Sequence, residues 1–382
     1  MKEQNILLAS EDYAEIDKYI KDNAIQSILL VCDGSIRFLR VNEYFKRLES
    51  AGDANVFRFS DFQPNPLYES VVKGVNAFLT NGCDTIWAVG GGSAMDVAKC
   101  IKLYSNMDHT KNYLQQEIVP NDVKLLALPT TAGTGSEATR YAVIYYEDAK
   151  QSVTHESIIP STVVFDPSVL ASLPVYQKKA TLMDALCHSI ESFWSVNSSE
   201  QSKQYSAVAI RLIMENWREY IAGNNEKNEV MLKAANMAGK AINITQTTAG
   251  HAMCYKLTSL YGIAHGHAAA LCVPALWEYM SEHLENSVDR RGQDYVRTNF
   301  EQIAEAMGCK GIKDAIDSLR SMMVTLGLGV PNMDGEEDFE ILKKSVNPVR
   351  LKNNPVGLSE EDIDGIYRTI FEGQEYGSRI IC

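Results

Sequence analysis

Apolar and polar positions along residues 1–167 predict a parallel β-sheet covered by helices. Short apolar runs are separated by amphipathic stretches, which is the pattern of repeated β-α-β units. We expect buried strands within 27–35, 84–93, 123–136 and 161–167, because each apolar run there ends in turn-forming residues. Glycines and hydroxyl side chains gather where these strands end, and open α/β sheets bind ligands at that edge.

The pattern changes after Pro167. From Ser168 onward apolar residues recur with a period near 3.6, as in "KKATLMDALCHSIESFW" and "QYSAVAIRLIMENWREYI". This predicts an α/β domain over 1–167 and an all-α domain over 168–382, and a chain of 382 residues is long enough for two domains. We expect a short hinge near 166–170 and a cleft between the domains.

The composition argues against several kinds of partner. With 36 basic and 49 acidic residues the net charge is −13, and so acidic a surface repels nucleic acid and anionic lipid. The longest apolar stretch, 268–277, contains Pro274 and is shorter than the roughly 18 residues of a membrane span. Because the first residues are polar rather than secretory in pattern, we expect a cytoplasmic protein.

The eight cysteines form no C-x-x-C pair, so the sequence predicts neither a zinc knuckle nor a disulfide framework. Cys187 and Cys254 stand beside motif residues. For both, a small buried side chain is the favoured interpretation over a ligand or redox role.

A glycine-rich loop follows the predicted strand at 84–93. Gly90, Gly91 and Gly92 come directly after the apolar run, and Ser93 opens a helical stretch. Glycines let the backbone approach a phosphate, and the free N–H groups of a helix N-terminus bind anions. The loop therefore suits a nucleotide pyrophosphate, although a tight turn without a ligand would have the same pattern.

Two further segments end at the same predicted edge. The loop "LPTTAGTGSEATR" supplies hydroxyls and flexible backbone suited to a ribose or a carboxamide, from Thr130, Thr131, Gly133, Thr134, Gly135 and Ser136. Asp33 ends the first strand, where a carboxylate accepts hydrogen bonds from an adenosine ribose and repels a 2′-phosphate. This favours NAD over NADP, but Asp33 as a simple turn residue fits the spacing almost as well.

Aspartate and histidine are spaced for metal binding in two places. Asp184 and His188 are four apart on a helical stretch, so they share one face and can chelate a divalent ion, or form an ordinary hydrogen bond. His251 and His265 are 14 positions apart, and a continuous helix would hold them about 21 Å apart. They can share a metal only if the helix breaks, for which Gly262 is the candidate.

One aspartate and three histidines suit a borderline ion such as Fe²⁺ or Zn²⁺. An open coordination position would make the ion a Lewis acid. His265 and His267 point in different directions if helical, so we expect only one of them to be a ligand.

Taken together, "GGGSAMDVAK", "LPTTAGTGSEAT", "MDALCHSIES" and the H-x₁₃-H-G segment resemble the iron-containing (group III) alcohol dehydrogenases over nearly the whole chain. The resemblance implies a dinucleotide-binding α/β domain followed by a helical domain, as in dehydroquinate synthase and glycerol dehydrogenase. It implies four metal ligands: Asp184, His188, His251 and His265. It places Gly91, Gly92 and Ser93 on the pyrophosphate, and Thr130, Thr131 and Thr134 along the cofactor. Asp96 and Lys150 would lie on the nicotinamide side, and Asp33 where NAD-preferring members carry an aspartate.

The chain departs from the family at one place. Many members carry a further histidine four residues after the first of the late pair, often followed by proline, where this chain has Tyr255 and Lys256. The proton relay then falls to His267, Tyr255 or water. The amino-acid sequence of this segment is similar to that of a subgroup named phosphonoacetaldehyde reductases. In such an enzyme Lys256 and Arg140 would supply positive charge for an anionic substrate. Alternatively, Lys256 is solvated and Arg140 pairs with a carboxylate.

The resemblance implies reversible hydride transfer between NAD(H) and a small aldehyde or primary alcohol, with phosphonoacetaldehyde and 2-hydroxyethylphosphonate as the specific pair. A general alcohol or diol dehydrogenase of the butanol, 1,3-propanediol or lactaldehyde type is the alternative. A lyase similar to dehydroquinate synthase and a non-catalytic nucleotide-binding protein belong to other classes. We expect a homodimer or larger homo-oligomer.

Overall fold

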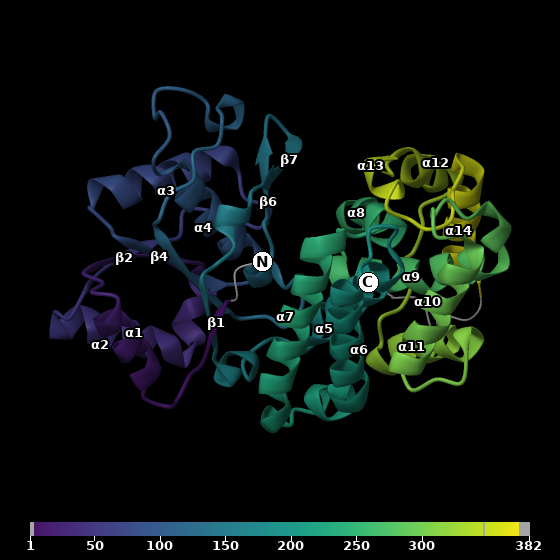
Figure 1. Ribbon diagram of the computed structural model, residues 1–382, viewed down its shortest axis with the longest axis horizontal. Coiled ribbons are helices and arrows are strands. Elements are labelled where there is room, and N and C mark those ends of the chain that lie inside the picture. Colours follow the sequence, from purple (N-terminus) through teal and green to yellow (C-terminus); the bar gives the residue numbers. More distant parts are fainter. Residues whose placement is uncertain (1–3, 347, 374–382) are drawn as a thin grey trace. The chain divides into compact units, whose positions relative to one another are not determined.

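The computed structural model describes residues 4–346 and 348–373 and divides into two compact units (Figure 1). The sheet unit comprises Met1–Thr131, Gly135–Leu173 and Asn225–Leu232. The helical unit comprises Ala132–Thr134, Pro174–Asn224 and Lys233–Cys382, of which residues 347 and 374–382 lie outside the described part. Two short segments thus belong to a unit other than that of their sequence neighbours.

The sheet unit is built on six parallel strands in the order β1-β8-β5-β4-β2-β3. The strands are β1 (Asn5–Leu8), β2 (Ser27–Cys32), β3 (Asn55–Phe59), β4 (Thr85–Gly90), β5 (Lys124–Pro129) and β8 (Thr162–Phe165). The four predicted strands are confirmed as β2, β4, β5 and β8. They are buried at nearly every position, which is why they read as continuous apolar runs.

The two edge strands, β1 and β3, were not predicted. Their residues are mostly exposed or half-buried, because an edge strand has a neighbour on one side only. They therefore lack the long apolar run that marks a central strand.

Helices cover the sheet, and a hairpin stands beside it (Figure 1). The helices are α1 (Ala14–Asp22), α2 (Arg40–Ala51), α3 (Tyr68–Thr80) and α4 (Gly92–Tyr104), and the antiparallel hairpin pairs β6 (Tyr141–Tyr146) with β7 (Ala149–Thr154). α4 packs against β4, β5 and β6, and its apolar residues join those of the central strands in one core. This packing fixes the start of α4 at the carboxyl end of β4.

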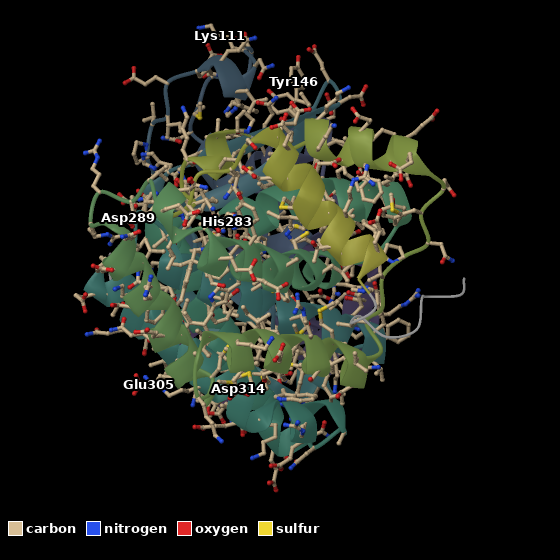
Figure 2. All side chains as sticks on the ribbon, turned by 90° about the vertical axis from the view of Figure 1, so that its right-hand side faces the viewer. Lys111, Tyr146, His283, Asp289, Glu305 and Asp314 are labelled. Carbon is tan, nitrogen blue, oxygen red and sulfur yellow. The ribbon has the colours of Figure 1, made fainter. Side chains whose placement is uncertain are left out.

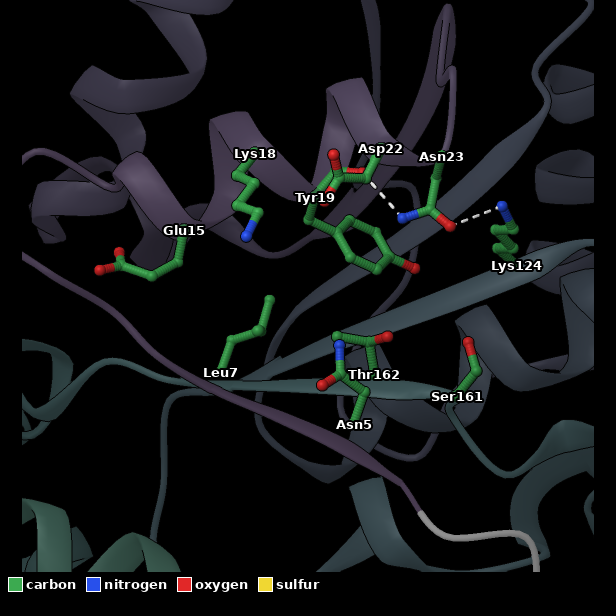
Figure 3. Close-up of a pocket in the computed structure, with 10 residues that line it drawn as sticks. All are labelled: Asn5, Leu7, Glu15, Lys18, Tyr19, Asp22, Asn23, Lys124, Ser161 and Thr162. Atoms are coloured by element: carbon green, nitrogen blue, oxygen red, sulfur yellow. Dashed lines mark hydrogen bonds between the residues drawn. The ribbon is translucent and has the colours of Figure 1, made fainter.

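The amino ends of β1, β5 and β8 border an open pocket of about 620 Å³ at the opposite edge of the sheet. Figure 3 shows its lining residues, which come from α1 and from the beginnings of β1, β5 and β8. None of the sequence-predicted site residues lines this pocket. It is therefore distinct from the edge at which the glycine loop lies.

The described part of the chain after Phe165 contains no strand, so the predicted change to helical structure is confirmed. The long helices are α5 (Val175–Trp194), α6 (Glu200–Ile221), α7 (Asn228–Thr245), α8 (Ala249–Tyr261), α9 (His265–Glu282), α10 (Gln293–Ala306) and α11 (Ile312–Leu326). α12 (Glu336–Lys344), α13 (Pro348–Leu351) and α14 (Glu360–Glu372) follow. α5 packs on α6 and α9, and α9 on α8, which buries most residues of α5 and α9.

Charged side chains lie on the outer surface of the helical unit. Figure 2 shows Glu305 and Asp314 on neighbouring helices, and both are exposed. Among the described residues, no helix combines the length and the apolar character that a transmembrane segment requires.

Candidate functional site

Three adjacent strands bring the predicted cofactor residues to one edge of the sheet. Asp33 follows β2, Gly91 follows β4 and Thr130 follows β5, and these strands are direct neighbours in the order β5-β4-β2. The Asp33 carboxylate accepts a hydrogen bond from the Ser35 backbone N–H at 2.7 Å and lies beside Gly90. Asp33 is thus a turn residue and also lies at the predicted binding edge, so the two interpretations of its spacing are compatible.

The glycine loop leads straight into α4. Gly91 precedes the helix in an extended conformation, and no side chain caps the N–H groups of the first turn. A Cβ on Gly90 would lie 2.6 Å from Cβ of Ala94, so only glycine fits the tight start of the helix. Gly91, Gly92 and Ser93 are half-buried, which leaves their backbone donors available to an anion.

The second loop lies next to the glycine loop. The Thr130 N–H donates to the Gly90 carbonyl at 3.0 Å, and a Cβ on Gly91 would touch the Thr131 side chain. Further along, Gly133 packs directly on α5, where a Cβ would lie 2.6 Å from Cβ of Thr181, and Thr134 follows in the same loop.

A buried lysine that the sequence analysis did not single out holds the second loop in place. Lys99 of α4 is fully buried, and its Nζ donates to the Ser136 carbonyl and hydroxyl, to the Thr139 hydroxyl and to the Tyr141 carbonyl at 2.5–3.1 Å. Burial lowers its pKa to about 8. The sequence contained a pattern that could have predicted this contact. A lysine on the buried face of a helix needs hydrogen-bond acceptors, and a hydroxyl-rich loop supplies them.

Asp96, one turn earlier on α4, ties the same loop to the hairpin. Its carboxylate accepts hydrogen bonds from the Ser136 hydroxyl at 3.0 Å and from the Val143 N–H at 3.1 Å. Burial raises the Asp96 pKa, while Lys99 and Lys150 lower it. Lys150 lies on β7 and is exposed. Asp96 therefore holds the second loop against the hairpin. This role is separate from its predicted position along the nicotinamide.

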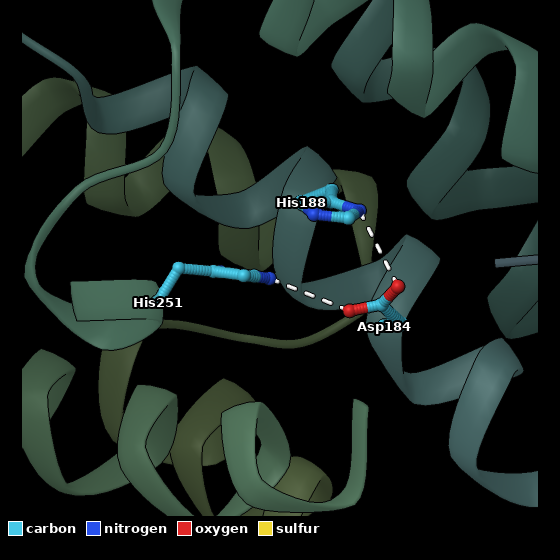
Figure 4. A group of neighbouring side chains, drawn as sticks. All are labelled: Asp184, His188 and His251. Atoms are coloured by element: carbon cyan, nitrogen blue, oxygen red, sulfur yellow. Dashed lines mark hydrogen bonds and ion pairs between the residues drawn. The ribbon is translucent and has the colours of Figure 1, made fainter. Parts of the chain in front are cut away.

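In the helical unit, three predicted metal ligands come together. Asp184 and His188 project from one face of α5 and His251 projects from α8 (Figure 4). One donor atom from each lies within 4.8 Å of the other two, and all three residues are buried. The His188 and His251 rings stack with centroids 4.3 Å apart. His188 Nδ1 is buried and has no hydrogen-bond partner among the described residues.

The break predicted at Gly262 is confirmed. α8 ends at Tyr261, Gly262 adopts a left-handed conformation (φ 66°), and α9 begins at His265. The His265 ring is 5.3 Å from the His251 ring, between Tyr255, which stacks on it at 5.2 Å, and Cys254, whose Sγ lies 3.5 Å from His265 Nδ1. His265 is thus beside the group of Asp184, His188 and His251 but does not join it at 4.8 Å.

Gly266 lets α9 reach this position. A Cβ there would lie 2.0 Å from the Ala180 carbonyl oxygen and 2.6 Å from Cβ of Asp184, so the start of α9 touches the backbone of α5. The contact sets His265 beside Asp184 and explains the glycine that follows the histidine.

Gly266→Ala is expected to destabilise the protein by roughly 1–3 kcal/mol, because a methyl group there forces α5 and α9 apart. Tightly held metal should be lost at the same time, as measured by elemental analysis after gel filtration. Gly365→Ala, in the middle of α14 with open space around it, is the matched control and should leave the metal content unchanged. Normal metal content in Gly266→Ala would contradict this role.

Glu191, one turn after His188 on α5, is the main residue of this region that the sequence analysis missed. Its Oε2 is hydrogen-bonded to His251 Nδ1, and its Oε1 accepts from the Thr248 hydroxyl at 2.6 Å and from the backbone N–H groups of Thr248 and His251. The bond turns His251 Nε2 toward Asp184, whose Oδ1 is 3.4 Å away. The spacing Asp184-x₃-His188-x₂-Glu191, all on one helix face, was the available signal.

Charge in this group favours a bound cation. Burial alone would lower the pKa of His251, but the Glu191 and Asp184 carboxylates raise it to about 9. Burial lowers the pKa of His188 to about 4, so that its imidazole is neutral at neutral pH. Two buried carboxylates facing one imidazole therefore hold either a proton or a metal ion, and metal binding would displace the proton.

The three predicted catalytic residues have different surroundings. Both nitrogens of buried His267 are occupied, Nδ1 by the Tyr176 hydroxyl at 3.1 Å and Nε2 by the Gly329 carbonyl at 2.9 Å, so the contacts indicate a structural role. Burial raises the pKa of Tyr255, the residue stacked on His265, to about 12. Lys256 is half-buried and makes no side-chain hydrogen bond or ion pair with any described residue.

Comparison with known proteins identifies the family. The model for "iron-containing alcohol dehydrogenase" matches residues 4–167, and the model for the C-terminal part of the Fe-containing alcohol dehydrogenase family matches residues 178–371. The chain belongs to the iron-containing alcohol dehydrogenase family. It is 29% identical over 340 residues to long-chain-alcohol dehydrogenase 1 of Geobacillus thermodenitrificans, covering 84% of this chain and 83% of that protein.

Two further proteins are similar to this chain. The chain is 31% identical over 367 residues to the 1,3-propanediol dehydrogenase of Citrobacter freundii, covering 90% of this chain and 91% of that protein. The crystal structure of sulfoacetaldehyde reductase from Bifidobacterium kashiwanohense in complex with NAD⁺ superposes with a TM-score of 0.85 at 27% identity, covering 97% and 98% of the two chains.

The residues present fit the metal of an iron-containing alcohol dehydrogenase. They offer one carboxylate and imidazole nitrogens, all buried, and one of these nitrogens, His188 Nδ1, has no hydrogen-bond partner among the described residues and lies 3.9 Å from Asp184 Oδ2. Such a donor set suits Fe²⁺ or Zn²⁺.

Proposed function

We propose that this iron-containing alcohol dehydrogenase transfers a hydride reversibly between NAD(H) and a small aldehyde or primary alcohol. The observation that carries the proposal is the buried group of Asp184, His188 and His251, with His265 beside it. We propose that these four residues hold Fe²⁺, with Zn²⁺ as the alternative. When bound, the ion would polarise the substrate carbonyl as a Lewis acid.

The chain's own residues have distinct roles in this proposal. Glu191 and Asp184 orient His251, and Gly266 allows His265 to approach. Both nitrogens of His267 are occupied, so we propose that the hydroxyl of Tyr255, or water, supplies the proton.

The proposed NAD site uses the carboxyl edge of the sheet. Gly91, Gly92 and Ser93 would bind the pyrophosphate through their backbone N–H groups at the start of α4. Thr130, Thr131 and Thr134 would line the cofactor, with Asp96 and Lys150 on the nicotinamide side. NAD bound to sulfoacetaldehyde reductase, a relative of the same fold, supports this assignment.

Asp33 is expected to exclude NADP by repelling the 2′-phosphate. Asp33→Asn keeps an acceptor for the Ser35 N–H but loses the charge, so kcat/KM with NADPH should rise roughly tenfold relative to kcat/KM with NADH. Steady-state kinetics with both cofactors measure the ratio. Asp122→Asn, an exposed aspartate before β5 at the other edge, is the control. An unchanged ratio in Asp33→Asn would remove Asp33 from cofactor selection.

The specific substrate that we propose is phosphonoacetaldehyde, reduced to 2-hydroxyethylphosphonate. Its support is the similarity to sulfoacetaldehyde reductase, which is named for an aldehyde with an anionic group. Lys256 could supply positive charge, whereas Arg140 is paired with Glu156 at 2.5 Å. A diol or short-chain alcohol dehydrogenase is the alternative, supported by the 1,3-propanediol dehydrogenases among the relatives.

The direct test follows NADH absorbance with a panel of aldehydes: phosphonoacetaldehyde, sulfoacetaldehyde, propanal, 3-hydroxypropanal and lactaldehyde. We expect turnover that a chelator removes and Fe²⁺ or Zn²⁺ restores. A lyase similar to dehydroquinate synthase would show no net NADH turnover, and a non-catalytic protein would bind NAD without reducing any aldehyde. Either outcome would overturn the proposal.

We further propose a homodimer or larger homo-oligomer in the cytoplasm, on the resemblance to family members. Light scattering after gel filtration measures the assembly, and a monomer at micromolar concentration would contradict it.

A further inference from the structure

Arg350 of α13 lies next to the part of the helical unit that carries the proposed metal ligands. α13 packs on α8, the helix that carries His251 and Tyr255. The Arg350 Nη1 donates a hydrogen bond to the Thr247 hydroxyl at 2.7 Å, and the side chain is partly buried. Thr247 lies just before Thr248, which hydrogen-bonds Glu191 and precedes α8. The guanidinium group is therefore fixed at the N-terminal end of the helix that bears a proposed metal ligand.

Arg350 differs from the other arginines that are shielded from solvent. Among the described residues, the three other arginines that are not exposed are each paired with a glutamate: Arg140 with Glu156 at 2.5 Å, Arg320 with Glu278 at 2.6 Å and Arg368 with Glu336 at 2.8 Å. Arg350 has no carboxylate partner within residues 4–346 and 348–373. Because the chain carries 13 more acidic than basic residues, a carboxylate was readily available to pair with it. Partial desolvation of a guanidinium group without an anionic partner costs free energy, so an anion bound at this position would stabilise it.

Residues 246–247, which include the acceptor for Arg350, are tied to Asn353 by hydrogen bonds and offer one further donor. Asn353 Nδ2 donates to Gln246 Oε1 at 3.2 Å and to the Thr247 carbonyl at 3.1 Å, and Gln246 has a positive φ of 60°. Strained backbone of this kind persists only where surrounding contacts enforce it. The Thr247 hydroxyl accepts from Arg350, and its own hydrogen has no acceptor among the described residues.

We propose that Arg350, together with the Thr247 hydroxyl, binds an anionic group at the end of the substrate remote from its carbonyl. This inference rests on the proposed dehydrogenase function and specifies its substrate class: short aldehydes that carry a sulfonate, phosphonate or carboxylate. A guanidinium fork matches the paired oxygens of these groups, and a neighbouring hydroxyl donor adds a third hydrogen bond. Arg350 is then a specificity-determining residue, and the metal is approached by the carbonyl end of the same molecule.

The experiment compares Arg350→Met, Arg350→Lys and the control Lys352→Met, which removes the same charge from an exposed residue two positions away. Lys256→Met tests the lysine suggested by the sequence. Steady-state kinetics use phosphonoacetaldehyde, sulfoacetaldehyde and propanal with NADH. In Arg350→Met we expect kcat/KM for both anionic aldehydes to fall about 10- to 100-fold, mainly through KM, and that for propanal to change less than about threefold. Arg350→Lys should fall between wild type and Arg350→Met, and Lys352→Met should match wild type.

A second measurement does not depend on turnover of an anionic substrate. Ethylphosphonate and ethanesulfonate should inhibit propanal reduction competitively, with a Ki that rises about tenfold or more in Arg350→Met and is unchanged in Lys352→Met. Equal losses for propanal and the anionic aldehydes, or an unchanged Ki, would overturn the role of Arg350 while leaving the dehydrogenase function intact. The absence of NADH turnover with every aldehyde in the wild-type protein would instead overturn the proposed function.

Discussion

Replacing His265 by alanine is expected to remove the tightly held metal and to lower kcat/KM for aldehyde reduction by about 10³-fold or more. A bound metal contributes several kcal/mol of transition-state stabilisation, and each ~1.4 kcal/mol corresponds to a factor of ten. His265 is the first residue of α9 and lies between His251 and Tyr255. Without it, the proposed site keeps Asp184, His188 and His251 but loses its fourth donor.

His267→Asn is the matched control, two positions along the same helix. His267 binds the Tyr176 hydroxyl and the Gly329 carbonyl, so this variant should lower the free energy of unfolding by about 1–3 kcal/mol while metal binding persists. Elemental analysis, thermal unfolding and NADH kinetics separate the two effects. Full metal content and activity in His265→Ala would refute its assignment as a ligand, and loss of metal in His267→Asn alone would exchange the two roles.

Glu191→Gln is expected to weaken metal binding by about 10- to 100-fold, the usual effect of removing a carboxylate that orients a metal-binding histidine. The Glu191 carboxylate holds the proton on His251 Nδ1, so that Nε2, which faces Asp184, would be the atom to lose its proton and bind the metal. Glutamine is neutral and also offers an amide donor, which does not select this tautomer. Competition with a chelator gives the affinity, and the absorption spectrum of the Co²⁺-substituted protein reports the ligand geometry.

Ser192→Ala is the control for Glu191. Ser192 is the next residue of α5, is fully buried and accepts a hydrogen bond from the Thr245 hydroxyl at 2.9 Å. Its loss should cost about 1 kcal/mol of stability without changing the affinity for metal. If both variants lowered stability equally and neither changed the Co²⁺ spectrum, Glu191 would have only a structural role.

Much of the fold could be predicted, because burial leaves a local signature. β2, β4, β5 and β8 are buried at nearly every position, and their apolar runs stand out in the sequence. The edge strand β1 exposes most of its residues and has no such run. In the hairpin outside the main sheet, β6 does have an apolar run, YAVIYY, which the sequence analysis did not single out. The segment Asn225–Leu232 belongs to the sheet unit although helical residues flank it. Periodicity describes a segment by itself and does not report which unit it joins.

The sequence by itself determined the four central strands and the change to helices after them, the glycines at the start of α4, the pair Asp184 and His188 on one helix face, and the break at Gly262. Each depends on spacing within one segment. Only the tertiary structure decided which side chains from distant segments meet. It placed Glu191 behind His251, occupied both nitrogens of His267, and left Arg350 without a carboxylate among the described residues. Hydrogen bonds and ion pairs between segments depend on the approach of whole helices, which no local pattern encodes.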